Sequence, residues 1–488
     1  MTSGKLSQSR TCVSRRQLGG LAAGAGALAL TGLRQAPAFA QSAAKIVIIG
    51  GGPGGATVAN RLKAADPNLD ITLIEPKETY TTCFYSNLYL GGFRSFQSIT
   101  HNYEGIKKRG IKVVRDLAAS IDTTAKTVAL AKAASSIPYD RLVVAPGIEL
   151  KYETIEGYSA EAADVMPHAW QGGAQTWLLK EKLLAMSDGG LVVMAAPPMP
   201  YRCPPGPYER ACMIAHFLKT RKPKSKLIIF DPKSTFSKQG VFEEAFKEFY
   251  GGIVELNLTN EIDDFAVMRV DAKTGEVVTK AGQSARAAVA NIIPAQKAGA
   301  IAASAGLTDG DWCPVNPENF TSKKAKDVYV VGDAAVAADM PKSAYAALSQ
   351  AGFVALDLIA DIGGRSREAG KYRNICWSML APDNSAKIGG DYVPAEKDGK
   401  TYLEAKDPFV SKAGESAELR RETFIESSNW YDTLTADIFD SKAHKPDAQA
   451  APVVNDRKDK AETDGTSGAK SEAGAAVKAS AGKDKPKN

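Results

Sequence analysis

Cysteine is the residue type in this 488-residue chain whose positions most clearly suggest chemistry. The chain contains six cysteines: Cys12, Cys83, Cys203, Cys212, Cys313 and Cys376. We expect Cys12 to leave with a signal peptide, and the odd number that remains means that at least one is free or bonded to something other than cysteine. Cys203 lies in the stretch YRCPPGPYERAC, where prolines hold a thiol in a stiff loop. No C-x-x-C-H motif occurs, so we expect this chain to carry no c-type haem of its own.

The most specific cofactor motif begins at KIVIIGGGPGG. An apolar strand leads into Gly50, Gly52 and Gly55 in the G-x-G-x-x-G spacing, and a helix and a second strand ending in Glu75 follow. Gly50 permits the tight turn, Gly52 lets the backbone approach a pyrophosphate, and Gly55 lets the helix pack closely on the strand. Glu75 can accept hydrogen bonds from a ribose. The motif predicts a dinucleotide site and leaves both FAD and NAD open.

Two later stretches favour FAD. DVYVVGDAAVAADMPKSAYAALSQAG is an apolar strand that ends in Gly332 and Asp333 and is followed by a helix. In two-dinucleotide oxidoreductases such an aspartate binds the ribityl chain of FAD, and the helix N-terminus stabilises negative charge on the reduced flavin. YDRLVVAPGIEL, over 139–150, resembles the strand and turn at which the chain leaves the first FAD segment.

A second nucleotide loop is expected after the strand LVVMAA, but its glycines are missing. Ala195, Ala196, Pro197 and Pro198 stand in their place. Proline has no N–H to donate to a phosphate, and side chains block the close approach of a cofactor. The later strand LIIFD, ending at Asp231, indicates that the domain is retained while its NAD(P) site is lost.

These patterns predict an α/β protein with two Rossmann-like domains and a smaller C-terminal α+β domain. The 44% hydrophobic content suits two or three packed domains, and the scattered net charge of +6 gives little support to nucleic-acid binding. The expected order is a signal peptide over 1–40, a first FAD segment over 41–160, a second Rossmann-like domain over 161–288, a second FAD segment over 289–367, a C-terminal interface domain over 368–445 and a disordered tail over 446–488.

The N-terminus predicts export by the twin-arginine route. Arg15 and Arg16 precede a short apolar run, and APAFA resembles a cleavage site. An ordinary secretory leader is the alternative, and either places the mature protein in the periplasm. After the leader no other run of about 18 apolar residues appears, so we expect no stable membrane insertion.

Five stretches resemble one known family: ETYTTCFYSNLYLGG, YRCPPGPYER, DWCPVNPENF, NICWSML and NWYDTLTADIF. They resemble the flavoprotein subunit of flavocytochrome c sulfide dehydrogenase, from about 45 to about 440. The resemblance implies a glutathione-reductase-like flavoprotein fold. It also implies that Cys83 carries FAD through a thioether, that Cys203 and Cys376 form a redox-active disulfide beside the flavin, and that Glu209 handles protons there.

Each of these roles has a structural alternative. Cys83 could be a small buried hydrophobic residue, the Cys203–Cys376 disulfide could be merely structural, and Glu209 could lie on a solvated helix face. The C-terminal tryptophans Trp377 and Trp430 could cover the flavin or belong to a core. We expect Cys212 to be a core residue, assign no chemistry to Cys313, and find no metal-ligand spacing among His101, His168, His216 and His444.

The resemblance implies a periplasmic sulfide:cytochrome c oxidoreductase. It would use FAD to oxidise sulfide to zero-valent sulfur or polysulfide, and it would pass electrons to a c-type cytochrome subunit that carries the haem, as a heterodimer. The alternatives are a sulfide:quinone oxidoreductase, which would need a membrane-docking C-terminal segment, an NAD-linked disulfide reductase, and a non-catalytic flavoprotein subunit of a sulfur-oxidation complex.

Overall fold

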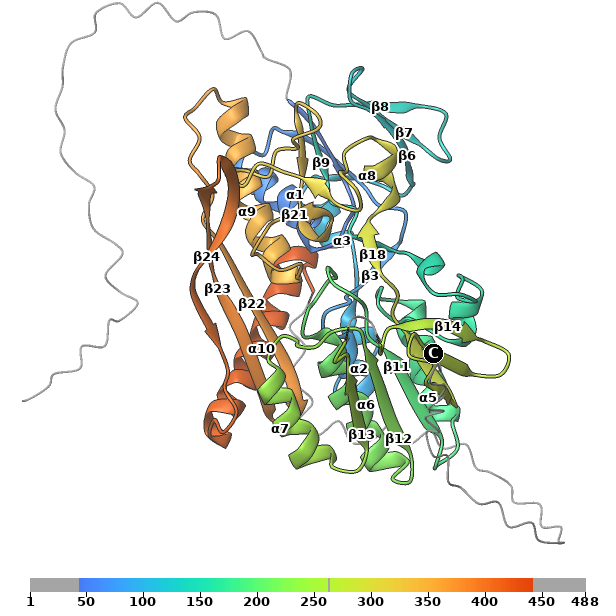
Figure 1. The fold of residues 1–488 in the computed structure, drawn as a ribbon. Coiled ribbons are helices and arrows are strands. Elements are labelled where there is room, and N and C mark those ends of the chain that lie inside the picture. The colour runs from blue at the N-terminus through green and yellow to red at the C-terminus, as the bar shows by residue number, and fades with distance from the viewer. Residues whose placement is uncertain (1–43, 262–263, 442–488) are drawn as a thin grey trace, which may run out of the picture. The chain divides into compact units, whose positions relative to one another are not determined.

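The structure is a computed structural model that describes residues 44–261 and 264–441 (Figure 1). The signal peptide predicted over 1–40 and the tail predicted over 446–488 lie outside the described residues. The described part is an α/β protein with two parallel sheets and a C-terminal antiparallel sheet, which confirms the predicted fold class.

A five-stranded parallel sheet forms the centre of the first domain. Four of the five residues of its middle strand are buried, which explains why KIVII reads as a continuous apolar run rather than an alternating one. The strands in spatial order are β20 (Val328–Val330), β9 (Arg141–Val144), β1 (Lys45–Ile49), β2 (Asp70–Ile74) and β5 (Lys112–Val114).

Helices α1 (Pro53–Ala65) and α9 (Ala344–Ile362) pack against each other in this domain. By length and composition α9 is the one described helix that could cross a membrane, but it also packs against β22 of the C-terminal sheet, as a core helix does. The remaining elements of the domain are α3 (Glu104–Lys108), α8 (Ala300–Ser304), η3 (Gly332–Ala334), the meander β6 (Ala118–Asp122), β7 (Thr127–Leu130) and β8 (Ser136–Pro138), and the strand pair β19 (Cys313–Pro314) and β21 (Ala335–Val336).

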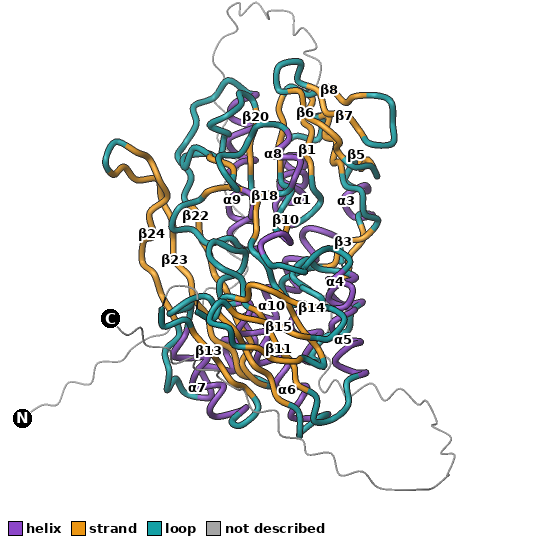
Figure 2. Tube along the Cα trace, turned by 45° about the vertical axis from the view of Figure 1, so that its right-hand side comes forward, coloured by secondary structure: helices purple, strands orange, loops and turns teal. Residues whose placement is uncertain are grey.

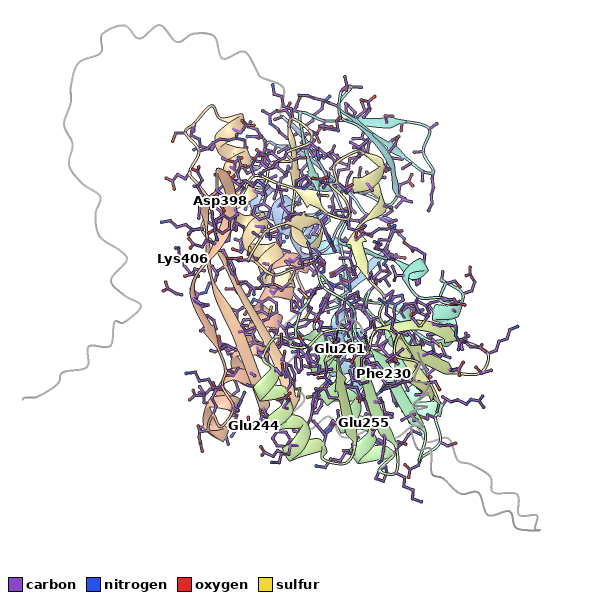
Figure 3. The ribbon with its side chains drawn as sticks, viewed as in Figure 1. Phe230, Glu244, Glu255, Glu261, Asp398 and Lys406 are labelled. Carbon is purple, nitrogen blue, oxygen red and sulfur yellow. The ribbon has the colours of Figure 1, made fainter. Side chains whose placement is uncertain are left out.

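The second domain has a four-stranded parallel sheet with buried apolar residues on both faces, such as Phe230, which Figure 3 labels. In spatial order its strands are β13 (Val254–Leu258), β12 (Lys226–Asp231), β11 (Leu191–Ala195) and β17 (Val289–Ile292). Its other elements are α4 (Ala162–Val165), α5 (Ala174–Ala185), α6 (Gly206–Arg221), α7 (Gln239–Tyr250), η2 (Tyr152–Thr154), β14 (Val267–Asp271), β15 (Glu276–Thr279) and β16 (Ser284–Arg286).

The predicted boundary at 288/289 is wrong by one strand. β17 pairs in parallel with β11, from Val192↔Val289 to Ala195↔Ile292, so it belongs to the second domain. The chain returns to the first domain through β18 (Gln296–Ala298), which pairs with β10 (Ile148–Leu150). The apolar run VANII resembles a core strand of either domain, and only its pairing partner decides between them.

The C-terminal sheet and helix pack against both domains (Figures 1 and 2). Tyr372 and Leu403 join the core of the first domain, whereas Met379 and Leu380 join a core of the second. Glu244 of α7, labelled in Figure 3, forms an ion pair of 3.2 Å with Arg420. The elements are β22 (Tyr372–Ala381), β23 (Asn384–Lys397), β24 (Lys400–Val410) and α10 (Ala417–Phe439).

One further group of short elements connects the first sheet to the second domain. It comprises β3 (Thr79–Thr81), α2 (Ser86–Gly91), η1 (Gln97–Ile99) and β4 (Thr100–Asn102). α2 packs against α5 and α6 of the second domain, and this contact places Cys83, just before α2, near the loop that carries Cys203.

Two glycine-to-alanine substitutions should move stability in opposite directions. A Cβ at Gly55 in α1 would lie 2.0 Å from the Gly50 carbonyl oxygen, so Gly55→Ala should lower the free energy of unfolding by about 1–3 kcal/mol. A Cβ at Gly352 in α9 would meet nothing within 4 Å, so Gly352→Ala should raise it by about 0.5–1 kcal/mol. Thermal unfolding of the two variants measures both effects, and equal melting midpoints would contradict the packing assigned to Gly55.

Candidate active site

The glycine loop between β1 and α1 is shaped by two close backbone contacts. Gly50 has φ +99°, and a Cβ there would lie 2.2 Å from the Ala145 carbonyl oxygen. A Cβ at Gly55 would meet the Gly50 carbonyl, as described above. At Gly52 a Cβ would meet only the Tyr80 ring, at an ordinary 3.6 Å. Gly52 therefore leaves room on the open side of the loop, where a phosphate can approach α1.

Glu75 lies at the end of β2, beside this loop. One carboxylate oxygen accepts a hydrogen bond of 2.8 Å from the Gly51 N–H, and the other accepts one of 3.0 Å from the Lys77 N–H. The Tyr103 hydroxyl donates to the Gly51 carbonyl oxygen at 3.2 Å. Each Glu75 oxygen keeps a further lone pair, so the side chain can still accept bonds from a ribose.

A single cavity of about 1350 Å³ extends from the glycine loop to the C-terminal sheet. Its volume exceeds that of ordinary small-molecule pockets, which suits a ligand as long as a dinucleotide. Its lining includes eight of the nine residues that the sequence suggests for catalysis or cofactor binding: Gly50, Gly52, Glu75, Cys83, Cys203, Glu209, Asp333 and Cys376. The ninth, Gly55, lies behind the loop and packs against its backbone.

Three buried polar atoms in the cavity lining have no hydrogen-bond partner among the described residues. They are Asp333 Oδ1, Trp170 Nε1 and Trp377 Nε1. Unpaired buried polar groups are costly, so these atoms indicate a polar ligand that pairs with them. Together with the space at Gly52, they fit a bound flavin dinucleotide.

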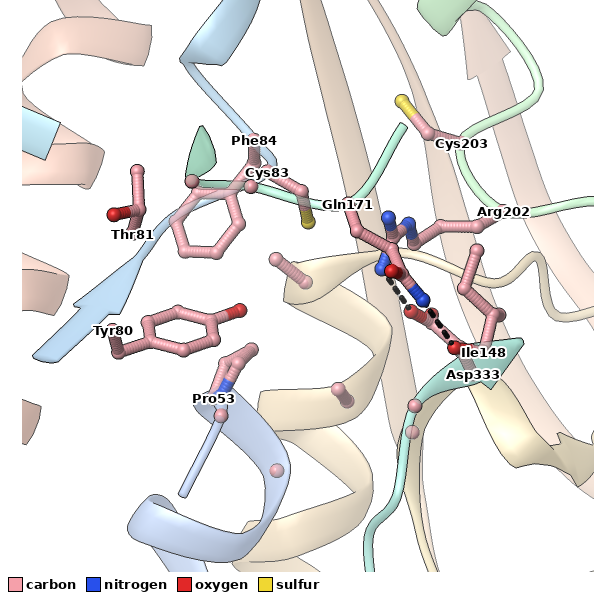
Figure 4. Close-up of a pocket in the computed structure, with 18 of the residues that line it drawn as sticks. Pro53, Tyr80, Thr81, Cys83, Phe84, Ile148, Gln171, Arg202, Cys203 and Asp333 are labelled. Atoms are coloured by element: carbon pink, nitrogen blue, oxygen red, sulfur yellow. Dashed lines mark hydrogen bonds and ion pairs between the residues drawn. The ribbon is translucent and has the colours of Figure 1, made fainter. Parts of the chain in front are cut away.

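Arg202 reaches into the same space (Figure 4). Its guanidinium lies 3.4 Å from Asp333 Oδ2 and donates to the Trp170 carbonyl oxygen. In Figure 4 the side chains of Cys83, Arg202 and Cys203 surround one open volume. A cation at this position can balance negative charge on a bound cofactor or on a thiolate.

Cys203 occupies a strained backbone position between β11 and α6. Its φ of +60° lies in the left-handed region, which side-chain-bearing residues rarely adopt. Its N–H donates to the Lys342 carbonyl oxygen at 2.8 Å, and its carbonyl accepts from the Gly206 N–H at 2.7 Å. A Cβ at Gly206 would lie 3.0 Å from the Cys203 sulfur, so this glycine makes room for the thiol.

Cys376 approaches the cavity from the middle of β22. It is 8% exposed and shares one face of the strand with Asn374 and Ser378, as the two-residue period requires. The Asn374 side-chain amide lies 3.5 Å from the Cys376 sulfur. Burial raises the pKa of both thiols, and the neighbouring Cys376 adds to the increase at Cys203.

The structure does not contain the predicted Cys203–Cys376 disulfide. All five described cysteines, 83, 203, 212, 313 and 376, are free thiols. Cys203 and Cys376 nevertheless line the same cavity, and a negative charge on Cys376 raises the pKa of Cys203. Cys212 and Cys313 are fully buried and do not line the cavity.

Glu209 does not lie on a solvated helix face. Its two carboxylate oxygens accept hydrogen bonds from the Asn87 amide at 2.8 Å and from the Met379 N–H at 2.9 Å. Burial raises its pKa, which makes the carboxyl a better proton carrier near neutral pH. Its neighbour Arg210 is 2% exposed and donates to Asn87 Oδ1 at 2.9 Å.

Sequence reasoning missed four cations near the cysteines: Arg202, Arg210, Lys238 and Lys342. Arg202 precedes Cys203 in the sequence, and Arg210 follows Glu209. Their position next to these two candidate residues could have indicated them. The two lysines gave no local signal. Lys342 donates to the carbonyl oxygens of Asp333 at 2.9 Å and Ala335 at 2.8 Å. Because its own carbonyl accepts from the Cys203 N–H, it joins the segment that carries Asp333 to the loop that carries Cys203.

At the site predicted to have lost its nicotinamide cofactor, side chains around the end of β12 pair with one another. Asp231, at the end of β12, is 0% exposed. Its carboxylate accepts from the Tyr208 hydroxyl at 2.6 Å and pairs with Lys233 at 2.5 Å. The Tyr208 ring stacks on Phe236 with centroids 3.5 Å apart.

No group of three or more metal-ligating side chains occurs in the part of the chain that the structure describes. His101 bonds Tyr431 and Ser441, and His168 accepts from the Trp170 N–H, so both take part in packing. His444 lies outside the described residues.

Comparisons with known proteins match residues 44–294 and 368–439 to family models. Three family models match: pyridine nucleotide-disulphide oxidoreductase over 44–175, the central part of the sulfide dehydrogenase (flavocytochrome c) flavoprotein chain over 176–294, and the flavin-binding part of flavocytochrome c sulphide dehydrogenase over 368–439. A sulfide dehydrogenase (flavocytochrome c) flavoprotein chain of Chlorobaculum thiosulfatiphilum is 46% identical over 43 residues, which cover 9% of this chain and 90% of that one.

Two sulfide:quinone oxidoreductases are also similar. The mitochondrial protein of Mus musculus is 23% identical over 326 residues, 64% of this chain and 69% of that one. The X-ray structure from Aquifex aeolicus superposes with a TM-score of 0.59 at 22% identity, covering 81% of this chain and 95% of that one. At this identity the structural likeness shows a shared fold.

Proposed function

This chain belongs to the family of flavocytochrome c sulfide dehydrogenase flavoprotein chains, a family of sulfide-oxidising flavoproteins, and from this membership we propose its individual reaction. We propose that it oxidises sulfide through a Cys203–Cys376 disulfide and passes the electrons to a c-type cytochrome. The observation that supports this most directly is the shared cavity, in which both cysteines lie with the glycine loop and Asp333.

The residues around the cavity divide the binding of FAD among them. The Gly52 end and the α1 N-terminus would hold the pyrophosphate, Glu75 the adenosine ribose, and Asp333 the ribityl chain. Cys83, at the cavity wall, would form the thioether to the flavin. FAD, when bound, supplies an acceptor for two electrons that can leave one at a time.

Cys203 and Cys376 would cycle between disulfide and dithiol. Hydrosulfide attacks one sulfur of the disulfide, the S–S bond breaks, and the products are a cysteine persulfide and a thiolate. A second sulfide can then remove the outer sulfur as polysulfide. Glu209, whose pKa burial raises, lies where it can take a proton from hydrogen sulfide or from a thiol and hold it out of water.

Two features support an acceptor other than NAD(P). Pro197 and Pro198 offer no N–H to a phosphate, and the Asp231 carboxylate already pairs with Tyr208 and Lys233. No haem motif occurs in the sequence, so the haem would belong to the cytochrome partner. We place the reaction in the periplasm, where the predicted twin-arginine leader would deliver the folded flavoprotein.

An aromatic cluster at the C-terminal sheet supports electron exit on that side of the cavity. The Trp430 ring lies 5.1 Å from Trp377 and is stacked at 5.7 Å on Tyr345, between centroids. All three residues line the cavity. We therefore expect a cytochrome to dock over β22 and α10, beside this cluster.

Quinone is the second candidate acceptor, because two similar proteins are sulfide:quinone oxidoreductases. Such an enzyme would need a membrane-docking C-terminal segment, and residues 442–488 lie outside the described residues. An acceptor assay separates the two candidates directly.

Anaerobic sulfide should bleach the flavin of the purified protein, and oxidised cytochrome c should then be reduced faster than a short-chain quinone. Cys203→Ala and Cys376→Ala should each lower the rate of bleaching at least 100-fold, because neither variant can form the disulfide. Cys212→Ala, on the same helix as Glu209 but outside the cavity, is the matched control and should keep the rate within about twofold. Stopped-flow absorbance measures these rates, and bleaching by NADH but not by sulfide would contradict the proposal.

Covalent attachment predicts flavin fluorescence that migrates with the polypeptide on a denaturing gel. Cys83→Ser should abolish this band, because a serine oxygen cannot form the thioether, while the folded variant should still bind FAD non-covalently. Cys313→Ser serves as the control and should keep the band. A fluorescent band that persists in Cys83→Ser would show that another residue carries the flavin.

A further inference from the structure

Lys238 is a buried lysine with an unusual set of partners. It is 6% exposed, and its ammonium donates to Ser378 Oγ at 2.8 Å and to the carbonyl oxygens of Cys376 at 3.1 Å and Ala386 at 3.4 Å. All three acceptors are neutral. Among the described residues no carboxylate lies within ion-pair distance of its ammonium, although buried lysines are normally paired with one.

The backbone makes this placement still less favourable. Lys238 is the N-cap residue of α7, with φ +64° in the left-handed region. A helix N-terminus favours negative charge, and a left-handed lysine costs conformational energy. Burial without a carboxylate and the helix N-terminus both disfavour the cation, which points to a compensating negative charge nearby.

Cys376 provides that charge when it ionises. Burial lowers the pKa of Lys238 to about 8, and a negative charge on Cys376 opposes this change more strongly than Glu209 or Cys203 does. Conversely, Lys238 is the group that most opposes the increase that burial causes in the pKa of Cys376. Arg420 is the remaining charged group that affects Lys238, and it disfavours the ammonium.

Cys376 and Cys203 differ in the groups that can stabilise their thiolates. The Cys376 sulfur has the Asn374 amide at 3.5 Å and Lys238 bonded to its own backbone carbonyl. Within the described ranges the Cys203 sulfur has no hydrogen-bond donor, and burial holds the pKa of this thiol well above its ordinary value, although Lys238 opposes this increase as the smallest of the contributing effects. In thiol–disulfide exchange the better stabilised thiolate is the better leaving group.

We propose that Lys238 is a positioning residue that stabilises the thiolate of Cys376 and thereby directs hydrosulfide to Cys203. This inference rests on the proposed function. The hydrosulfide sulfur forms a bond to Cys203 Sγ as the Sγ–Sγ bond breaks, and the electron pair of that bond stays on Cys376. The persulfide on Cys203 keeps the hydrosulfide proton, and the step needs no other reactant.

The first test measures the ionisation of Cys376 without sulfide. In a Cys203→Ala background of the full-length flavoprotein, the rate of alkylation of Cys376 by iodoacetamide is followed against pH by peptide mass spectrometry. Adding Lys238→Met should raise the apparent pKa of Cys376 by about one to three units, which is a loss of at least tenfold in alkylation rate at pH 8. Adding Lys238→Arg, which keeps the charge, should restore most of the rate.

Lys180→Met is the matched control. Lys180 is also a partly buried lysine, and burial lowers its pKa to about 8, but its hydrogen bond goes to the Leu90 carbonyl oxygen at 2.7 Å and not to β22 or β23. This variant should leave the titration of Cys376 unchanged. An equal profile for Lys238→Met and Lys180→Met would overturn the inference, and so would failure of Lys238→Arg to restore the rate in a protein with normal circular dichroism.

The second test locates the added sulfur. The oxidised protein receives one equivalent of sulfide, free thiols are blocked, and the peptides are mapped. An extra sulfur on Cys203 supports the inference, and one on Cys376 overturns it. Sulfide that adds to neither cysteine would refute the proposed function, while the alkylation profiles would still decide the role of Lys238.

Discussion

The hydrogen bond from the Cys203 N–H to the Lys342 carbonyl joins the two halves of the site. It fixes a left-handed cysteine in a proline loop of the second domain to the segment of the first domain that carries Asp333. The Lys342 ammonium bonds the Asp333 and Ala335 carbonyls, so this one residue holds both the loop that carries Cys203 and the segment that carries Asp333. This bond therefore helps to hold the strained backbone at Cys203 in place.

The C-terminal sheet supplies the other half of the sulfur pair. β22 packs on α9 and on α6, and it brings Cys376 to the cavity from more than 170 residues beyond Cys203. Glu209 of α6 accepts a hydrogen bond from the Met379 N–H of this strand, so the acid and the second cysteine are held by the same contact. The three parts of the fold therefore meet at the site: the first domain contributes Asp333, the second domain Cys203 and the C-terminal sheet Cys376.

Much of this site could be predicted from local sequence. The glycines, Glu75 and Asp333 stand at fixed positions relative to strand ends, and such positions are encoded within a few residues. The family resemblance indicated Cys83, Cys203, Cys376 and Glu209 as a set. All nine of these candidate residues except Gly55 line the cavity.

The remainder depends on tertiary packing that no local pattern reveals. Lys238 reads as a surface lysine before an amphipathic helix, and only the approach of β22 and β23 buries it. Arg210 was not singled out from the sequence, yet its guanidinium bonds the His168 and Ala169 carbonyl oxygens inside the protein. The strand β17 was assigned to the wrong domain because a strand's sequence does not name its partner.

The central claim is that Cys203 and Cys376 are a redox pair facing one bound flavin. A crystal structure of the oxidised, FAD-loaded protein tests it most directly, with the sulfur positions located from their anomalous scattering. The account predicts a single S–S bond of about 2.05 Å between the two residues, in contact with the isoalloxazine ring. Two separate sulfurs whose Cα atoms lie more than about 7 Å apart, or a bond far from the ring, would contradict it.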